Sequence, residues 1–517
     1  MKRNLIFILL ILLGLALRLY GLDKYPLWLD EVTAASARSD IPGVSSFVQS
    51  FKQPPVLEKN DYHYSYNRFF VFYWKKISGN SEFYLRLSSV IFALLGLYML
   101  YRLGSLLYGL RVARLSLFLL AVSPFHLHYS QELRSYAAIT SLSLLAFYIS
   151  LKITKNEKNV YWIGYILINL LIVAFNYMML VVVLAQCVFL ALNLRRQAHF
   201  PAKLVSAHLV IFSFSAGLII FFHPSLLFRL GRPVPIELTD LPVWGQEVGI
   251  SNILFTLKNF SLGYNIDAYS AAGLSISFIF FALFLAGCIK DKSKAAFTFK
   301  AVIVFFPVLF IFLFSKFVKS IYIYRYFLAV YPVYLLGVAA GLANLKRGLR
   351  YVLLAVISVS LVFSLRNYYR SILPGSHFQH TGVFSKDTDI TGAIEFISGR
   401  FIINDRIFFT SWLDIPPFKF YMPKAASQGS QEFFQETEKE KMFWLDKQGN
   451  LTFITYQDSR PESVEPVAFT RAGKVDRIWL VNDLFDPKPA VIKMLQDMYG
   501  AGQKQDFKNL EVYLFSR

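Results

Sequence analysis

The chain has 517 residues, of which 55% are hydrophobic and 17% aromatic, a composition that excludes an ordinary soluble domain. Its formal net charge of +20 is compatible with nucleic-acid binding, but the positive residues lie in short clusters between apolar runs, as in the cytoplasmic loops of membrane proteins. We therefore expect no nucleic-acid partner. The two cysteines, Cys187 and Cys288, fall inside apolar runs, which excludes a disulfide framework and favours simple packing residues.

The first apolar run follows Met1-Lys2-Arg3 and covers residues 4–17. No small-residue cleavage site follows it, so we expect a retained membrane helix rather than a signal peptide. Ten further runs approach the roughly 20 residues that a helix needs to cross a bilayer. They lie near residues 86–108, 112–128, 135–152, 158–175, 177–194, 203–222, 270–290, 298–316, 321–343 and 350–368. The sequence thus predicts about eleven transmembrane helices.

Successive connecting loops are in turn rich and poor in lysine and arginine. The richer loops are those that a cytoplasmic N-terminus would place inside, such as 290–300 and 346–350, whereas the short loop at Asn176 has no lysine or arginine. Positive residues gather on the cytoplasmic side of membrane proteins. We therefore predict an integral protein of a bacterial or archaeal plasma (inner) membrane, with its N-terminus cytoplasmic and residues 23–85 forming an external loop.

The last part of the chain changes character after Leu373-Pro374-Gly375. Short β-type runs alternate with helical patterns there, which indicates a small extracytoplasmic α/β domain. The expected strands are 406–409, 451–454, 477–481 and 512–515, and the expected helices are 429–443 and 488–499. We predict two domains: an α-helical polytopic membrane domain over 1–369, including the 23–85 loop, and the α/β domain over 370–517.

A pair of adjacent carboxylates, Asp30 and Glu31, opens the external loop, and Arg18 stands near the end of the preceding helix. Neighbouring positions point in different directions, so the two carboxylates are expected to have different roles. One could act as a general base while the other caps a helix or holds an arginine. The alternative is that Asp30 is simply an N-cap and Glu31 a solvated neighbour.

Two further polar stretches are expected on the same external face, at 126–136 and at 322–326. Ionisable residues at a membrane boundary are costly to desolvate and by default suggest function. Arg134 and Arg325 offer planar, bidentate recognition of a lipid phosphate. The alternatives are a local Glu132–Arg134 ion pair and purely interfacial tyrosines. The two histidines of the first stretch have an i, i+2 spacing, a weak metal pattern, and we expect them to pack at the interface.

Together these stretches resemble a known superfamily, that of the protein O-mannosyltransferases and lipid A aminoarabinose transferases. The resemblance covers roughly residues 1–345 and rests on the order of several short motifs. These are Arg18, Leu27-Trp28-Leu29-Asp30-Glu31, Glu82-Phe83-Tyr84-Leu85-Arg86-Leu87-Ser88-Ser89, Ser123-Pro124, Tyr129-Ser130-Gln131-Glu132-Leu133-Arg134-Ser135-Tyr136, and Arg325-Tyr326 with Pro332.

The resemblance implies the GT-C membrane fold, a polyprenyl-phosphate-linked sugar as donor, and inversion at the anomeric carbon. It also implies that Asp30 is the catalytic carboxylate, with Glu31 beside it. The donor phosphate would be bound by Arg134, Arg325 and Arg18. The expected substrate contacts are Gln131, Glu132, Tyr136, His63 and Tyr326.

Two positions depart from the family's pattern. Many relatives carry His-Pro-Pro-x-Tyr in the first loop, where this chain has His63-Tyr64-Ser65, and many have His-Tyr where it has Asn176-Tyr177. If those histidines help to bind a metal or the acceptor, this protein does so differently. A divalent metal cofactor therefore stays open, with Asp30, His63 and Glu132 as its candidate ligands.

The expected reaction is a direct displacement, in which an extracytoplasmic glycan, lipid or protein acceptor attacks the sugar and the lipid phosphate departs. No GxxxxGK[ST] or GxGxxG phosphate loop occurs in the sequence, which argues against ATP use and dinucleotide binding. The alternative is a lipid-linked sugar flippase or another transporter. Transporters often show inverted repeats and ionisable groups near the midplane, whereas the acidic residues here are concentrated in outer loops.

Overall fold

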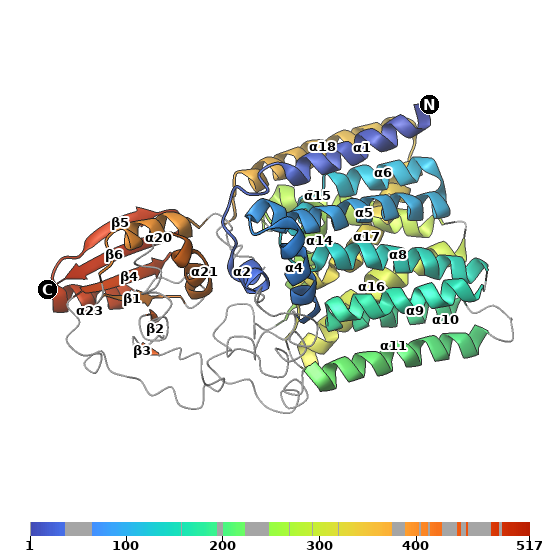
Figure 1. Cartoon of the computed structure of the whole chain (residues 1–517). Helices are drawn as coiled ribbons and strands as arrows, with labels where there is room; N and C mark the ends of the chain where they lie inside the picture. The colour runs from blue at the N-terminus through green and yellow to red at the C-terminus, as the bar shows by residue number, and fades with distance from the viewer. Residues whose placement is uncertain are drawn as a thin grey trace. The chain divides into compact units, whose positions relative to one another are not determined.

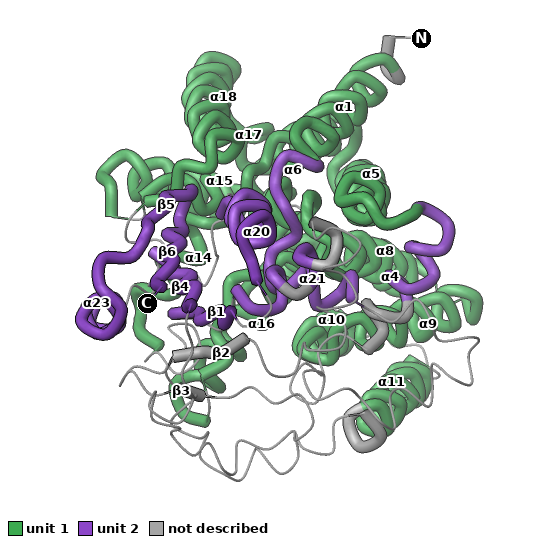
Figure 2. Tube along the Cα trace, turned by 60° about the vertical axis from the view of Figure 1, so that its left-hand side comes forward, with its two compact units in different colours: residues 1–22, 63–67, 79–384 green, residues 23–62, 68–78, 385–517 purple. Residues whose placement is uncertain are grey.

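A computed structural model describes most of the chain and divides it into two compact units (Figure 2). The helical unit comprises residues 1–22, 63–67 and 79–384, and the sheet unit comprises 23–62, 68–78 and 385–517. The predicted boundary after residue 369 stays a prediction. The structure describes residues 2–36, 65–156, 158–193, 200–222, 248–267, 269–291, 293–318, 320–374, 388–402, 405–411, 414–425, 442–445, 451–452, 477–484 and 489–516.

Long helices lie side by side in the helical unit (Figure 1), and each predicted apolar run coincides with one helix or with a broken pair. The long helices are α1 (Lys2–Leu19), α5 (Glu82–Tyr108), α6 (Leu110–Ala121), α8 (Tyr136–Lys155), α9 (Asn159–Phe175), α10 (Leu180–Leu192), α11 (Phe200–Phe222), α15 (Ala271–Ile289), α16 (Lys294–Phe317), α17 (Tyr331–Ala343) and α18 (Arg347–Tyr369). Shorter elements are α7 (Pro124–Ser130), η3 (Tyr177–Met179), α14 (Ile250–Leu262) and η4 (Tyr324–Ala329), and α4 (Ser65–Ser78) is shared between the units.

Six of the described helices are long and apolar enough to cross a bilayer, and a seventh span results if α6 and α7 form one. That pair is bent by 61° at the break between Ala121 and Pro124. Four further apolar helices are shorter: Leu5–Leu19, Asn159–Phe175, Tyr177–Leu192 and Tyr331–Ala343. Because of this bend, α7 and the residues after it turn away from the axis of α6.

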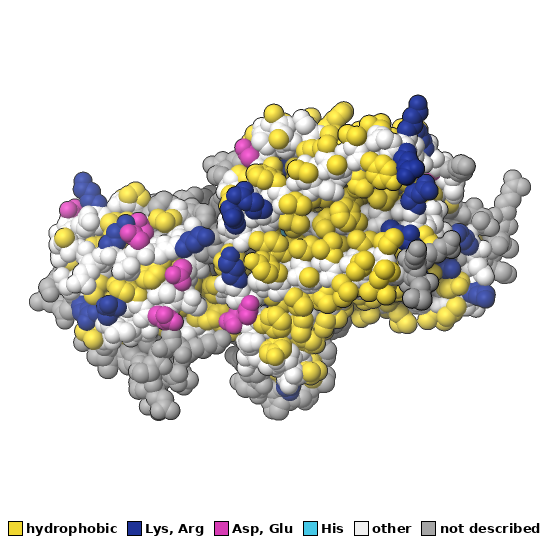
Figure 3. Space-filling model, turned by 90° about the horizontal axis from the view of Figure 1, so that it is seen from above, with side chains coloured by type: hydrophobic (Ala, Val, Ile, Leu, Met, Phe, Trp, Pro, Cys, Tyr) yellow, Lys and Arg dark blue, Asp and Glu magenta, His cyan; other side chains and the backbone are white. Residues whose placement is uncertain are grey.

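The outer surface of the helical unit is apolar. On the face drawn in Figure 3, hydrophobic side chains cover the helices, and lysine and arginine side chains gather toward the ends of this apolar surface. Leu9 and Leu12 of α1 and Val359 and Val362 of α18 are more than half exposed. Exposed leucine and valine in such numbers are favourable against lipid and unfavourable against water.

Helices α15 and α17 approach each other closely at three glycines. A Cβ atom built on Gly287 would lie 2.0 Å from the carbonyl oxygen of Gly337, and one on Gly341 would lie 2.0 Å from the carbonyl oxygen of Leu283. Gly337-Val338-Ala339-Ala340-Gly341 is a small-xxx-small motif, which lets helix backbones touch in a membrane, where helix association depends on close packing.

The sheet unit contains a six-stranded sheet with the order β3-β2-β1-β4-β6-β5. Strand β1 pairs in parallel with β2 and β4, and the remaining pairs are antiparallel. The strands are β1 (Arg406–Phe409), β2 (Met442–Leu445), β3 (Leu451–Thr452), β4 (Arg477–Asp483), β5 (Gln503–Phe507) and β6 (Leu510–Ser516). The helices of this unit are α2 (Leu29–Ala35), α20 (Ile390–Ser398), α21 (Ile415–Ala425) and α23 (Pro489–Tyr499), together with most of α4.

Successive side chains of a strand point to opposite faces of the sheet, and helices pack on both faces of this one. Phe408 and Leu480 form a core with Leu495 of α23, whereas Phe409 packs against Phe418 of α21 with ring centroids 5.0 Å apart. The expected strands and the helix near 488–499 are found, although β3 has only two described residues. The expected helix 429–443 lies mostly outside the described residues, and its last two positions begin β2 instead.

The contact between α15 and α17 gives a first prediction. Gly341→Ala places a methyl group against the Leu283 backbone, which cannot move as a side chain would, so the helices must separate. We expect a loss of about 1–3 kcal/mol in stability, measured as a lower unfolding temperature in detergent. Gly217→Ala in α11 is the matched control, since no atom lies within 4 Å of its Cβ position. Equal unfolding temperatures for the two variants would contradict the packing.

Candidate active site

Helix α2 carries the two adjacent carboxylates in its first turn. Trp28 is its N-cap, with extended backbone angles (φ −86°, ψ 174°), and Asp30 and Glu31 follow. Glu31 is fully buried, and its Oε2 accepts a hydrogen bond from the Trp28 amide at 3.5 Å. Asp30 is only half-buried. Glu31 thus caps α2 and is not solvated, unlike in the alternative with Asp30 as the cap, and the catalytic role of Asp30 stays a prediction.

Helix α7 and the turn after it bring polar residues into the interior of the helical unit. The hydroxyl group of Ser123 caps α7 by accepting from the His126 amide at 3.1 Å, and Pro124 occupies the first turn, where its missing N–H costs nothing. Glu132 is 1% exposed and Arg134 is 4% exposed. Burial of charged groups is costly unless they are paired, so the buried residues of this region need partners within the protein.

Arg18 and His126 form a fully buried contact between α1 and α7. The guanidinium group donates to the carbonyl oxygens of Gly14, Leu120 and Ala121 at 2.9–3.2 Å, and to Nδ1 of His126 at 2.8 Å. A guanidinium group only donates, so Nδ1 must accept and the proton of neutral His126 resides on Nε2. These contacts hold the Arg18 side chain between helices α1, α6 and α7. Its expected role as a phosphate ligand stays a prediction.

Gln131 joins the ends of two helices. Its Nε2 donates to the carbonyl oxygens of Arg18 and Tyr20 at 2.9 Å each, and its Oε1 accepts from the Tyr368 hydroxyl at 2.5 Å. The unpaired carbonyls at the end of α1 are thereby satisfied by a side chain. Gln131 therefore ties α1 and α18 to the turn after α7, and its expected contact with substrate is not tested.

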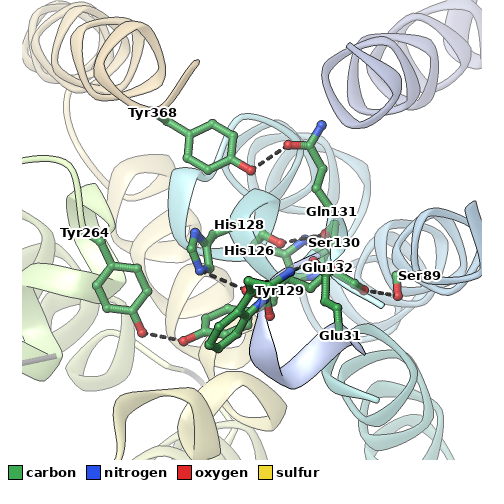
Figure 4. A network of polar contacts seen from close by, with 11 residues as sticks. Glu31, Ser89, His126, His128, Tyr129, Ser130, Gln131, Glu132, Tyr264 and Tyr368 are labelled. Carbon is green, nitrogen blue, oxygen red and sulfur yellow. Dashed lines mark hydrogen bonds and ion pairs between the residues drawn. The ribbon is translucent and has the colours of Figure 1, made fainter. Parts of the chain in front are cut away.

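A histidine–carboxylate pair lies in the same region (Figure 4). Nε2 of His128 is 3.2 Å from Oε1 of Glu132, one helical turn away, and the Ser89 hydroxyl donates to the Glu132 carbonyl oxygen. The His128 ring packs edge-on against Tyr264, whose hydroxyl is 2.6 Å from that of Tyr129. A tyrosine-lined polar cluster is thus embedded among apolar helices.

Two guanidinium groups lie near the same aromatic ring, that of Tyr136. Arg134 and Arg325 each lie 5.8 Å from the centroid of the Tyr136 ring. Arg325 and Glu132 also lie close enough to Tyr129 to interact with it electrostatically. Arg134 is buried and Arg325 is partly buried, and a positive charge away from water is stabilised by a negative one nearby. Arg134, Arg325 and Tyr136, three of the expected site residues, are therefore brought together.

The segment that carries Arg325 is held by α14. The Thr256 hydroxyl is 2.7 Å from the Tyr322 hydroxyl, and Nδ2 of Asn252 donates to the Tyr324 hydroxyl at 3.4 Å. Tyr326 is buried and stays an expected substrate contact. The tyrosines of this segment thus have packing roles that orient the arginine.

Sequence reasoning missed Tyr264 and Tyr368, because two tyrosines among 30 give no signal of their own. His63 lies outside the described residues. Among the described residues, no three or more His, Cys, Asp and Glu side chains group as a metal site would require, and metal binding stays a prediction. Cys187 and Cys288 are free thiols, in line with their expected packing role.

Comparison with known proteins adds three findings. Residues 68–220 match the family model described as dolichyl-phosphate-mannose-protein mannosyltransferase, and the search of curated proteins gave no match. The structure resembles ArnT from Cupriavidus metallidurans in the apo state, with 10% identity, a TM-score of 0.59, and coverage of 98% of this chain and 97% of that one. The same protein bound to undecaprenyl phosphate gives 11% identity, a TM-score of 0.56 and the same coverage.

These findings confirm the family resemblance and the fold class that the sequence predicted. The chain has the membrane fold of ArnT over almost its whole length, including the small C-terminal sheet region, so it is an integral membrane protein. The matched family segment covers the α7 region but ends before Arg325 and begins after Asp30.

The buried contact of Arg18 gives a second prediction. Arg18→Met removes the guanidinium group that donates to carbonyl oxygens of α1 and α6 and to Nδ1 of His126, and a buried group left unsatisfied costs about 1–3 kcal/mol. We expect a clearly lower unfolding temperature in detergent. Arg102→Met on α5 is the control, because that guanidinium is exposed and bonds to the Tyr98 and Tyr148 hydroxyls. A variant Arg18→Met as stable as this control would contradict the buried contact.

Proposed function

We propose that the protein is an integral-membrane inverting glycosyltransferase, which transfers a sugar from a polyprenyl-phosphate donor to an extracytoplasmic glycan, lipid or protein. The observation that carries the proposal is the convergence of Arg134 and Arg325 on Tyr136 inside an apolar helical unit. A lipid phosphate is an anion that two guanidinium groups can bind through charge-assisted hydrogen bonds, and its tail dissolves among lipid-facing helices. The family description and the lipid phosphate bound by ArnT support the same donor class.

The orientation proposed with this function has the N-terminus in the cytoplasm of a bacterial or archaeal cell. The basic loops 290–300 and 346–350 would face the cytoplasm, in accord with the positive-inside rule. The carboxylates of α2 and the residues after 370 would then lie outside. Soluble nucleotide sugars are cytoplasmic, whereas a lipid-linked sugar is accessible from the outer surface.

In the proposed mechanism, Asp30 takes the proton of an acceptor hydroxyl or amine while that group attacks the anomeric carbon. The new bond forms as the bond between the sugar and the phosphate oxygen breaks, so the configuration at the carbon inverts. The bonding electron pair leaves with the lipid phosphate, and Arg134 and Arg325 stabilise the extra charge. Glu31 does not react in this scheme, because it caps α2.

The carboxylate pair offers its own matched control. Asp30→Asn removes the base and should lower the transfer rate by roughly 10²–10⁴-fold. Glu31→Gln should retain most of the transfer, because an amide oxygen can still accept from the Trp28 amide. Polyprenyl-phosphate sugars and external glycoconjugates are profiled by mass spectrometry in membranes that lack the protein or contain each variant at matched expression.

In the Asp30→Asn membranes we expect a lipid-linked sugar to accumulate and one product to lack its sugar, as in membranes without the protein. That profile would also identify the donor and the acceptor. A normal product profile with Asp30→Asn would overturn the catalytic assignment and favour a flippase or another transporter.

The arginine pair gives a prediction about binding. Arg134→Ala and Arg325→Ala should each weaken the binding of undecaprenyl phosphate by about ten- to a hundredfold, since a hydrogen bond to a charged group contributes roughly 1.5–3 kcal/mol. Binding is titrated with purified protein in detergent, with Arg102→Ala as the exposed control. Unchanged affinity in both variants would exclude this arginine pair as the phosphate site.

A further inference from the structure

Helix α2 is too short to be stable by itself. It has seven residues, whereas isolated helices shorter than about 12–15 residues are marginal in water. Its position, and with it the position of Asp30, must therefore be set by contacts with other elements. The structure places α2 in the same compact unit as α21, and these two helices pack against each other.

The N-terminal side of α2 is held by Tyr421 of α21. The backbone N–H of Leu27 donates to the Tyr421 hydroxyl at 2.7 Å. Leu27 is fully buried and Tyr421 is 7% exposed, so water does not replace this bond readily. Leu27 precedes Asp30 by three residues, whereas Tyr421 lies 394 residues after Leu27.

The C-terminal end of α2 is held by Lys75 of α4. Its Nζ donates to the carbonyl oxygen of Ala35 at 2.6 Å. The last carbonyls of a helix have no partner within the helix, and a positive charge at this end is favourable. Both ends of α2 are thus fixed by side chains from distant parts of the chain.

Helix α21 is itself firmly supported. Phe418 is fully buried and packs against Phe409 of the central strand β1. Tyr421 follows Phe418 by one helical turn, so its hydroxyl is carried by an element that the sheet immobilises. A chain of contacts therefore runs from β1 through α21 to the segment that leads into α2.

We infer that the C-terminal sheet positions the reactive carboxylate, and that Tyr421 is the positioning residue through which it does so. This inference rests on the proposed function, in which Asp30 is the general base. It assigns to the C-terminal domain a part in the reaction itself. Because a displacement of about 1 Å can cost roughly a hundredfold in rate, a single hydrogen bond near Asp30 is sufficient to matter.

The test compares two variants that each lose one hydroxyl from the sheet unit. Tyr421→Phe removes the acceptor of the Leu27 amide, whereas Tyr513→Phe removes a hydroxyl that donates to Glu511 at 2.9 Å on the sheet. Amide hydrogen exchange of residues 27–35 is measured on the full-length protein in nanodiscs. The kcat and KM for transfer are measured alongside, with the donor and acceptor identified by the membrane profile.

In Tyr421→Phe we expect exchange at 27–35 to become several-fold faster and kcat to fall by about ten- to a hundredfold, with KM for the lipid donor unchanged. Tyr513→Phe should change neither quantity. A smaller fraction of folded protein would also lower the apparent kcat at unchanged KM, so the exchange data separate the two explanations. Loss of folded protein would speed exchange throughout the sheet unit, whereas loss of positioning speeds it at 27–35 alone.

Two outcomes would overturn the inference alone: unchanged exchange at 27–35 in Tyr421→Phe, or a normal kcat in this variant beside an inactive Asp30→Asn. Normal transfer by Asp30→Asn would instead overturn the proposed function. The exchange measurement needs no substrate, so it tests the hold on α2 even if the transfer assay fails.

Discussion

Charged and polar groups inside an apolar helical unit must find partners within the protein, since lipid offers none. This constraint explains most of the helical unit's interior. Arg18 donates to carbonyl oxygens of two helices and to His126, and Gln131 closes the end of α1 while it accepts from Tyr368. These groups form bonds that fix the helices around them. The convergence of Arg134 and Arg325 on one ring differs, because it brings two positively charged side chains to the same aromatic side chain.

The break between α6 and α7 makes this interior possible. A continuous helix satisfies its own backbone, but the 61° bend and the turn after α7 place polar backbone and side chains within the unit. Ser123 at the break caps α7 and also meets the Tyr331 hydroxyl at 2.7 Å. Irregular backbone of this kind is tolerated in membrane proteins where protein surrounds it or where it lines a cavity, which is also where a lipid-linked substrate can be bound.

Much of the architecture could be predicted from the sequence, because apolar runs and the charge of their flanks are local features. The eleven runs and the α/β character of the C-terminal part belong to this class. The different surroundings of Asp30 and Glu31, one half-buried and one fully buried, were also expected from their adjacency. Gly337 and Gly341 are four residues apart in the sequence, but no sequence feature indicates that α15 is their partner helix.

Partners that are distant in sequence could not be predicted. Nothing near Arg18 indicates that its guanidinium meets the carbonyl oxygen of Ala121, 103 residues away. The role of Arg18 as a phosphate ligand stays a prediction. Tyr421 lies 394 residues from Leu27, in a part of the chain that the family resemblance did not cover. Such contacts depend on the complete fold, so only a structure reveals them.

The central claim is that the arginine pair at Tyr136 binds the phosphate of the lipid donor. An experimental structure of the protein in nanodiscs with undecaprenyl phosphate tests it most directly. The account predicts phosphate oxygens within hydrogen-bond distance of the guanidinium groups of Arg134 and Arg325. A phosphate bound elsewhere, with both guanidinium groups still at the Tyr136 ring, would contradict it.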